Sequence, residues 1–469
     1  MKFRSTRGQS PHLSAEAVIL QGVAPDGGLY LPESFPRLPD AKTLRTLPYA
    51  ALAAEVLAPY FTHIDAAGIE TAAQKAYARF SADPPLRITG RAGRRVLELF
   101  HGPTLAFKDM ALCLLPHLMQ LAKKHVSTAA KTLLLTATSG DTGVAAMEGF
   151  ADMDGFEVIV FYPLGGVSPL QERQMLSVAS ANTTVIGLEG NFDDAQRGVK
   201  AMLGHATFKA RLDASGWAVA SANSINLGRL LAQIVYYVYT ALHVAEPLRF
   251  FVPTGNFGNV LAAHWAGHMG LSIEELVVAT NDNCVLDDFF CSGEYEADRP
   301  LIRSQSPSMD ILVSSNLERL LAEAGADAVR EAMQSLEQNR RFSWPRSIEG
   351  FSSGRIRQAE AAAEIRRAWR EEGELLDPHT AVASALHHKR AQAGIVVATA
   401  SPFKFPRFVL ESLGQKTGEN AFEDLKRLSD FSGQDIPKPL QRLETADIVQ
   451  KRTCTALQME QTVREVLDV

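Results

Sequence analysis

The chain has 469 residues, more than a single hydrophobic core usually supports, so two or three packed units are expected. Hydrophobic residues make up 46% and charged residues 21%, which is ordinary for a globular protein and excludes a disordered chain. The formal net charge of -6 lacks the basic excess of nucleic-acid-binding proteins, so no nucleic-acid partner is expected.

Neither a disulfide framework nor a membrane span is expected. The cysteines are scattered and no Cys-x-x-Cys spacing occurs among Cys113, Cys284, Cys291 and Cys454. The longest apolar run, 234–245, is interrupted by polar residues and is far shorter than the ~20 residues of a membrane helix. The first residues are basic, but no apolar segment of a secretion signal follows them. We therefore expect a cytoplasmic protein.

Short runs of β-branched and apolar residues alternate with segments of helical spacing through most of the chain. The runs predict strands at 95–100, 131–136, 156–162, 183–188, 217–221, 249–252, 276–280 and 395–400. Helices are predicted from about residue 144, over 224–244, and from the turn 253–259 through 268. Residues before 96 are predicted to be helical and rich in loops, and 316–390 to be mostly helix, interrupted near 344–354. This alternation indicates parallel sheets with helices on both faces.

Ligands of such sheets bind in the turns that follow the strands. The turn after the first predicted strand carries Lys108, within FHGPTLAFKDMAL (100–112). Its neighbours Leu105, Ala106 and Phe107 are apolar, and an amine held among apolar groups has a lowered pKa and can attack an aldehyde. The simpler alternative is a surface lysine at the start of a helix.

Two further turns offer sites for anions. TSGDTG (138–143) combines small hydroxyls with backbone N–H groups at a helix start, which suits a carboxylate. In PTGNFGN (253–259), Gly255 and Gly258 let the backbone approach a phosphate closely, although such turns are also common structural solutions. Neither a dinucleotide fingerprint nor a Walker A sequence is present. With Lys108, the turns favour pyridoxal 5'-phosphate, a cofactor with an aldehyde and a phosphate, and an amino-acid substrate.

These segments resemble those of the threonine synthases. The similarity includes STRG (5–8), APDGGLYLPE (24–33), FHGPTLAFKD (100–109), SGDTG (139–143), NSIN (223–226), PTGNFGN (253–259), PSMD (307–310) and DPHTAV (377–382). It follows the family's order from residue 5 to about residue 407. One departure is TASPFKF (399–405), where many members read TAHPAKF, which puts in doubt any role of the missing histidine.

The resemblance implies an α/β protein of fold type II among pyridoxal-phosphate enzymes, similar to the β subunit of tryptophan synthase. Two parallel-sheet domains with helices on both faces and an N-terminal helical and loop subdomain are then expected. The implied division is 1–94 for the N-terminal subdomain, 95–127 for a lysine-bearing segment packed with the large domain, 128–222 for a smaller mobile domain, and 223–469 for the large domain with its C-terminal helices.

The resemblance also implies roles for single residues. Lys108 would hold the cofactor as an imine and act as the catalytic base. The cofactor phosphate would be held by Gly255, Asn256, Phe257, Gly258 and Asn259. Thr399 would hydrogen-bond the pyridine nitrogen, and Asp141 would face the ring-oxygen side. The substrate would contact Thr138, Ser139 and Thr142 through its carboxylate, and Ser224 and Arg229, with Thr142, through its phosphate.

The implied reaction converts O-phospho-L-homoserine and water to L-threonine and phosphate. We expect a monomer or homodimer with a small-molecule substrate and no membrane or nucleic-acid partner. One alternative is a phospho-lyase on the same scaffold that releases 2-ketobutyrate. The other is a catalytically silent protein that senses phosphorylated metabolites, which would not need the amine of Lys108.

A histidine pair raises the question of a metal. His264 and His268 are four residues apart on a predicted helix, which is the spacing of a zinc pair. The residues between them, Trp-Ala-Gly, lack the glutamate of a metalloprotease. We interpret them as ordinary helix histidines, and no metal is expected.

Overall fold

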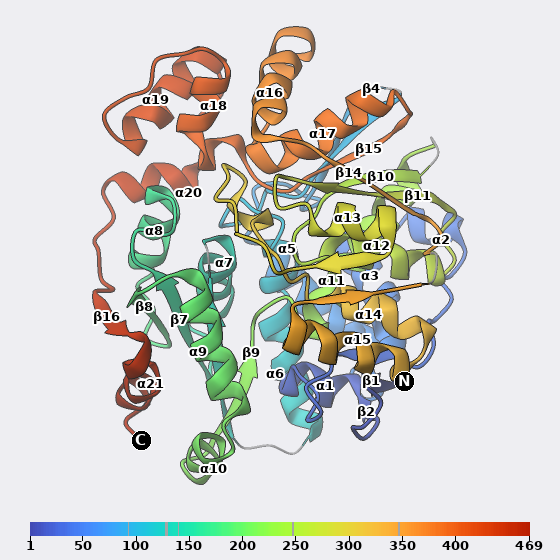
Figure 1. Cartoon of the computed structure of the whole chain (residues 1–469), viewed down its shortest axis with the longest axis vertical. Coiled ribbons are helices and arrows are strands. Elements are labelled where there is room, and N and C mark those ends of the chain that lie inside the picture. Colours follow the sequence, from blue (N-terminus) through green and yellow to red (C-terminus); the bar gives the residue numbers. More distant parts are fainter. Residues whose placement is uncertain (92, 127–129, 139, 246–247, 346–347) are drawn as a thin grey trace.

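A computed structural model of the protein describes residues 1–91, 93–126, 130–138, 140–245, 248–345 and 348–469. The protein is built around two large β-sheets (Figure 1). The larger sheet has the order β14 (Phe351–Arg355), β11 (Ile273–Thr280), β10 (Leu248–Pro253), β15 (Gly394–Ala398), β5 (Arg94–Glu98) and β4 (Arg87–Arg91). All its neighbouring strands are parallel except β4, which runs antiparallel to β5.

The smaller sheet is parallel throughout. Its order is β16 (Arg452–Thr455), β8 (Thr183–Glu189), β7 (Phe156–Pro163), β6 (Lys131–Ala137) and β9 (Trp217–Ser221). Each strand predicted from the sequence is present, and its ends lie within three residues of the predicted ones. The parallel arrangement is therefore confirmed, because the predicted strands pair with one another in that sense, and β4 alone adds an antiparallel neighbour to the larger sheet, beside β5.

Both faces of each sheet are covered by helices. In the larger sheet, Phe250 belongs to the core with α11 (Leu227–His243) and α12 (Gly258–His268). The next residue, Phe251, belongs to the core with α16 (Gln358–Glu372) and α17 (Pro378–Arg390). This alternation explains the continuous apolar strands, since a strand buried on both sides has no solvent-facing position.

The smaller sheet lies between two groups of helices in the same way. The helices α9 (Phe192–Gly204), α10 (Ala206–Ala214) and α21 (Met459–Leu467) share one core with Leu133 and Leu135. The helices α7 (Asp141–Phe150) and α8 (Pro169–Leu176) pack on the opposite face, where Leu134 points. The helix predicted from residue 144 starts three residues earlier, at Asp141.

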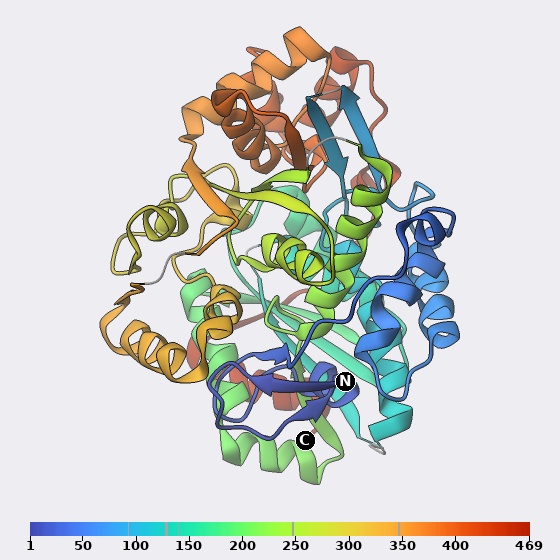
Figure 2. The same ribbon diagram turned by 90° about the vertical axis from the view of Figure 1, so that its right-hand side faces the viewer.

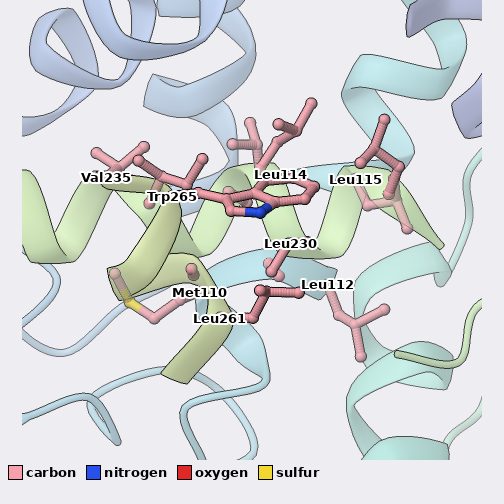
Figure 3. Packing of buried hydrophobic residues seen from close by; sticks show 14 of the residues in the cluster. Met110, Leu112, Leu114, Leu115, Leu230, Val235, Leu261 and Trp265 are labelled. Carbon is pink, nitrogen blue, oxygen red and sulfur yellow. The ribbon is translucent and has the colours of Figure 1, made fainter. Parts of the chain in front are cut away.

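The core between the larger sheet and the lysine segment is centred on Trp265 of α12 (Figure 3). Its indole is fully buried among leucines that include Leu114, Leu230 and Leu261. Leu114 precedes α6 (Leu115–Val126), which follows the short helix α5 (Asp109–Leu112) directly after Lys108. The segment that positions Lys108 is therefore anchored in the same apolar layer as α12.

The N-terminal region is only partly helical. The helices α1 (Ala15–Gln21), α2 (Ala41–Arg45), α3 (Tyr49–Leu57) and α4 (Ala66–Tyr77) are accompanied by a three-stranded antiparallel sheet, which the sequence reading missed. Its strands are β1 (Lys2–Ser5), β2 (Leu13–Ser14) and β3 (Tyr30–Pro32), too short to show a two-residue periodicity. The sheet lies at the opposite end of the molecule from β4 (Figures 1 and 2).

Two strands also interrupt the region that was predicted to be mostly helix. The strand β13 (Arg341–Ser343) pairs with β12 (Glu294–Glu296), and β14 forms the edge of the larger sheet. The sequence of β14, FSSGR, has no β-branched residue, so strand propensity does not reveal it. The region also contains α14 (Leu317–Leu321) and α15 (Ala326–Asn339), after α13 (Val285–Ser292).

The C-terminus requires one correction to the proposed domain division. The helices α18 (Pro406–Ser412), α19 (Ala421–Ser432) and α20 (Lys438–Gln441) follow β15. The chain then crosses back, and β16 adds to the smaller sheet beside β8 (Figure 1). Residues 452–467 therefore belong with the smaller unit and not with the large domain of 223–469; the rest of the division stays a proposal. No helix in the described ranges has the length and apolar character to cross a bilayer.

Candidate active site

The turns that follow β10, β15 and β5 lie side by side, because these strands are neighbours in the larger sheet. They carry the glycine-rich turn 253–259, Thr399 and Lys108 in that order. Two hydrogen bonds join the last two turns: the N–H of Phe107 donates to the carbonyl of Thr399 over 2.8 Å, and the N–H of Ser401 to that of Leu105 over 3.0 Å. The strand order therefore brings the predicted lysine and phosphate turns to one edge.

A buried carboxylate shapes the turn before Lys108. The N–H of Thr104 donates to Asp109 over 2.8 Å and its hydroxyl over 2.6 Å. A side chain at Gly102 would collide with Asp109, because its Cβ would lie 2.5 Å away from that residue. Burial raises the pKa of Asp109 to about 6, despite the hydrogen bonds from Thr104. Asp109 thus fixes the turn through its two hydrogen bonds with Thr104.

The amine of Lys108 is buried, with about a tenth of the side chain exposed. It donates to the hydroxyl of Ser308 over 3.0 Å and lies 3.4 Å from Asp141 Oδ2. Burial lowers its pKa, and the cations Lys404 and Arg229 lower it further against the opposing effect of Asp141. The predicted direction is confirmed, but its surroundings are more polar than the apolar neighbours in sequence suggested.

Asp141 connects the two sheets at this point, since it opens α7 after β6. Its Oδ1 accepts from Lys404 Nζ over 2.6 Å and from Gln171 Nε2 over 2.8 Å. Burial by itself would raise the pKa of Asp141, but Lys404 and Lys108 outweigh this effect and hold the pKa well below its usual value. The contacts of Asp141, which the sequence left uncertain, are therefore with two lysines, a glutamine and the hydroxyl of Ser308.

Lys404 and Gln171 are site residues that the sequence reasoning missed. The side chain of Lys404 is fully buried and also donates to the carbonyl of Thr104 over 2.8 Å. Lys404 stands in TASPFKF, so the departing motif at 399–405 did contain a signal. Gln171 belongs to α8 and carried no such signal. A second lysine can be buried beside Lys108 because the carboxylate of Asp141 compensates its positive charge.

The motifs PSMD and DPHTAV meet next to Lys108. Asp377 caps α17 and accepts from His379 Nδ1 over 2.8 Å. The other ring nitrogen of His379 accepts the backbone N–H of Ser308 over 3.2 Å, which places the imidazole proton on Nδ1. His379 therefore holds the segment whose hydroxyl contacts the amine of Lys108.

The turn at 138–143 is organised by Thr138. Its buried hydroxyl accepts from the N–H groups of Gly140 and Gly143 over 3.0 and 2.9 Å and donates to the carbonyl of Gly140 over 2.9 Å. The hydroxyl therefore holds the turn in shape, and its predicted contact with a substrate carboxylate stays a prediction. Thr142 is half-buried in the first turn of α7, and Ser139 lies outside the described residues.

The predicted phosphate turn begins α12, and Phe257 adopts a left-handed conformation at the helix N-cap with φ of 65°. The carbonyl of Asn256 accepts from the backbone and side-chain nitrogens of Asn316, both over 3.1 Å. At Gly255 a Cβ would lie 2.7 Å from the carbonyl oxygen of Ser308, so only glycine allows the turn to pack against the segment that contacts Lys108. Gly258 starts the helix itself.

Asn259 faces the interior. Its Oδ1 accepts from the hydroxyls of Tyr236 and Tyr237 over 2.5 and 2.7 Å. Its buried Nδ2 has no hydrogen-bond partner among the described residues. The side chain therefore fixes the turn to α11, and the N–H groups of the turn stay the candidates for holding a phosphate.

Arg229 and Ser224 lie where the chain crosses from the smaller sheet to the larger. Ser224 is half-buried in the turn after β9, and Arg229 is in the first turn of α11, which starts at Leu227 because Asn226 caps it. The guanidinium is buried and donates to the carbonyl of Ala222 over 3.0 Å. No described carboxylate pairs with it, and its Nε has no hydrogen-bond partner among the described residues. Burial lowers the pKa of Arg229 to about 10.

Thr399 is buried at the end of β15. Its backbone N–H donates to the hydroxyl of Thr380 over 3.2 Å, whereas its own hydroxyl makes no hydrogen bond to another described residue. A hydroxyl free to donate, between the amine and the glycine-rich turn, suits a ring nitrogen of a ligand. The position predicted for Thr399 thus offers the predicted chemistry.

The chain matches two family models. The model described as threonine synthase N terminus covers residues 2–77, and the model described as pyridoxal-phosphate dependent enzyme covers residues 96–399. A threonine synthase from Pseudomonas aeruginosa is 40% identical over 87% of this chain and 90% of the relative. One from Saccharomyces cerevisiae is 35% identical over 95% of this chain and 96% of the relative.

Solved structures give the same result. The structure of a threonine synthase with bound pyridoxal phosphate from Brucella melitensis has a TM-score of 0.85 and 37% identity, covering 99% of both chains. The threonine synthase from yeast has a TM-score of 0.88 and 31% identity, covering 100% of this chain and 99% of that one. The expected fold type II architecture is confirmed by this agreement over the full length.

Proposed function

Because the chain belongs to the threonine synthase family, we propose that it converts O-phospho-L-homoserine and water to L-threonine and phosphate. The observation that carries the proposal is a buried amine, Lys108, that lies near enough to a buried guanidinium without a described carboxylate partner, Arg229, for that cation to lower the pKa of the amine. A substrate that has both an amino group and a phosphate would use both.

The residues present fit pyridoxal phosphate, the cofactor of this family. Lys108 supplies a buried amine of lowered pKa, Thr399 a free hydroxyl, and the turn 255–259 the N–H groups of a helix start. When bound, pyridoxal phosphate supplies an aldehyde for amine groups and a ring that withdraws electrons from the substrate's α-carbon.

Lys108 is placed to move protons. An amine whose pKa is lowered toward neutrality can accept a proton in one step and return it in another. Asp141 and Lys404 set this property from opposite sides, because the carboxylate favours the charged amine and the second cation disfavours it. Ser308 orients the amine through its hydroxyl, and His379 holds Ser308 in place.

We propose that Arg229 and Ser224 receive the substrate phosphate. A planar guanidinium can donate two parallel hydrogen bonds to phosphate oxygens. Since Arg229 lacks a carboxylate partner among the described residues, a phosphate would supply the missing negative charge. The negative charge that grows on the leaving phosphate would be stabilised by the same group.

The start of α7 is placed to bind the substrate carboxylate. Thr138 fixes the turn by accepting two N–H groups, and Thr142 follows in the first helical turn. Asp141 links this unit to Lys404 and Lys108 of the other. We infer that the smaller unit closes over the site when the substrate binds, which would control the entry of water.

The cellular setting belongs to the same proposal. All four cysteines are free thiols, which suits a reducing compartment, and we propose a cytoplasmic location. We also propose a monomer or a homodimer, to be decided by light scattering of the purified protein.

Product analysis tests the proposed reaction. The purified protein with pyridoxal phosphate and O-phospho-L-homoserine should release L-threonine and phosphate in equal amounts. Release of 2-ketobutyrate in place of threonine would support the phospho-lyase alternative, and binding of the substrate without any product would support the silent binder.

A further inference from the structure

The histidine pair of α12 meets a glutamate that the sequence does not place near it. His264 and His268 lie in the last turns of α12, and Glu323 belongs to the 3-10 helix Ala322–Ala324 that follows α14. His264 Nε2 is 3.0 Å from His268 Nε2 and 3.0 Å from Glu323 Oε2. His268 Nε2 is 3.3 Å from the same oxygen. The three atoms form a nearly equilateral triangle.

The size of this triangle matches the ligand shell of a metal ion. Zinc is bound at about 2.0–2.1 Å by histidine nitrogen and about 2.0–2.2 Å by carboxylate oxygen, in tetrahedral geometry. Two such ligands of one ion are therefore about 3.3–3.5 Å apart. The observed edges of 3.0 to 3.3 Å are slightly shorter, and a small outward movement of the side chains would admit the ion.

Aromatic rings from two other segments hold the imidazoles in this orientation. Phe35 stacks on His268 with ring centres 4.7 Å apart, and Phe351 of β14 lies 5.1 Å from the ring of His264. The side chains of His264, Glu323 and His268 are 19, 29 and 38% exposed. An ion can thus reach the cluster from solvent, while the rings limit the rotation of its ligands.

From this convergence we propose that His264, His268 and Glu323 bind one divalent transition-metal ion of the zinc class, with water as its fourth ligand. Two imidazoles and one carboxylate are ligands that zinc, cobalt and nickel accept, whereas magnesium and calcium prefer oxygen. The proposal replaces the sequence interpretation of the pair as ordinary helix histidines, because the missing carboxylate comes from the turn after α14.

The position of the site suggests what the ion would do. It lies at the C-terminal end of α12, where a positive charge is favourable, and the other end of α12 carries the turn 255–259. Glu323 follows α14, and Asn316 at the start of α14 binds the carbonyl of Asn256 in that turn. The ion would therefore tie together the two elements that hold the turn proposed to bind the cofactor phosphate. Only this consequence rests on the proposed function.

The test measures metal binding by the purified holoenzyme. The protein is first treated with a chelator and freed of unbound cofactor. It is then titrated with zinc sulfate, and the bound zinc is quantified by inductively coupled plasma mass spectrometry. One equivalent per chain is expected, together with a higher melting temperature. Cobalt chloride in place of zinc should give the visible absorption of a tetrahedral ion.

Three variants identify the ligands. H264Q/H268Q should lose the equivalent of zinc and the cobalt absorption, and E323Q should weaken zinc binding by at least roughly tenfold. H388Q, which changes an exposed histidine at the end of α17, should behave like the wild type. The proposal is overturned if the wild type binds no zinc, or if H264Q/H268Q or the partly exposed E323Q binds it as tightly as the wild type. Threonine formation can be intact in either case, so this failure is distinct from failure of the proposed reaction.

Discussion

The two ends of the candidate site differ in how their positive charges are compensated. At the amine end, Lys108 and Lys404 share the carboxylate of Asp141, so the protein itself supplies a compensating negative charge there. At the other end, Arg229 is buried without a described carboxylate partner. A buried uncompensated charge is costly, so its presence indicates an anion that arrives with the ligand. The amine end is thus built for chemistry and the guanidinium end for binding.

The largest effect is expected from removing the amine. Lys108→Ala should abolish threonine formation and the visible absorbance of the bound cofactor, because no other group can replace its covalent role. Lys389→Ala removes an exposed lysine of α17 and should leave both unchanged. Steady-state kinetics and an absorption spectrum of each variant check the expectation, and normal turnover by Lys108→Ala would refute the role of Lys108.

Removing the guanidinium should act mainly on substrate binding and on the leaving phosphate. Arg229→Gln should lower kcat/KM by roughly 100- to 1,000-fold, the usual loss for a group that stabilises developing charge. Arg229→Lys keeps the charge but loses the planar fork, so it should fall between wild type and Arg229→Gln. Inorganic phosphate should inhibit the wild type more strongly than Arg229→Gln. If inorganic phosphate inhibits the wild type and Arg229→Gln equally, Arg229 does not bind phosphate, and the guanidinium end cannot be called the binding end.

The charge balance at the amine end should be adjustable in both directions. Asp141→Asn removes the group that raises the pKa of Lys108, so that pKa should fall further. Lys404→Met removes a cation that lowers it, so the pKa should rise. The pH dependence of covalent attachment of pyridoxal phosphate to the apoprotein reports the neutral amine, and its midpoint should move down in the first variant and up in the second. Shifts in the same direction would contradict the assigned charges.

A single hydroxyl at the binding end should have the smallest effect. Ser224→Ala removes one hydrogen bond, worth about 1 kcal/mol or roughly fivefold in affinity. We therefore expect KM to rise roughly fivefold, with kcat nearly unchanged and the same melting temperature. A large fall in kcat with constant KM would contradict the binding role of Ser224 and would show that it acts in the chemical step.

The sequence predicted the strands well where each is long and apolar, as in β6 and β7. The sequence did not predict strands whose formation depends on pairing with a distant strand. The strand β14 reads FSSGR and is a strand only because it pairs with β11, and β16 joins the smaller sheet from the far end of the chain. Such pairings depend on tertiary contacts that local periodicity does not contain.

The site shows the same division. Lys108 and the glycine-rich turn are visible in the sequence because their residue types stand at strand-to-helix turns, whereas Arg229 was assigned from the family resemblance alone. Lys404 reaches Asp141 across 263 residues of sequence, and Glu323 reaches His268 across 55, so neither contact is local. The sequence also did not reveal that the hydroxyl of Thr138 organises its own turn, because a free hydroxyl and one that accepts backbone N–H groups look alike in a sequence.

The most direct test of the central claim is to locate the covalent linkage. The holoenzyme is reduced with borohydride, digested, and its peptides are sequenced by mass spectrometry. Two buried lysines flank Asp141, and we expect the pyridoxyl group on Lys108 alone. A pyridoxyl group on Lys404, or on any other lysine with Lys108 unmodified, would contradict it.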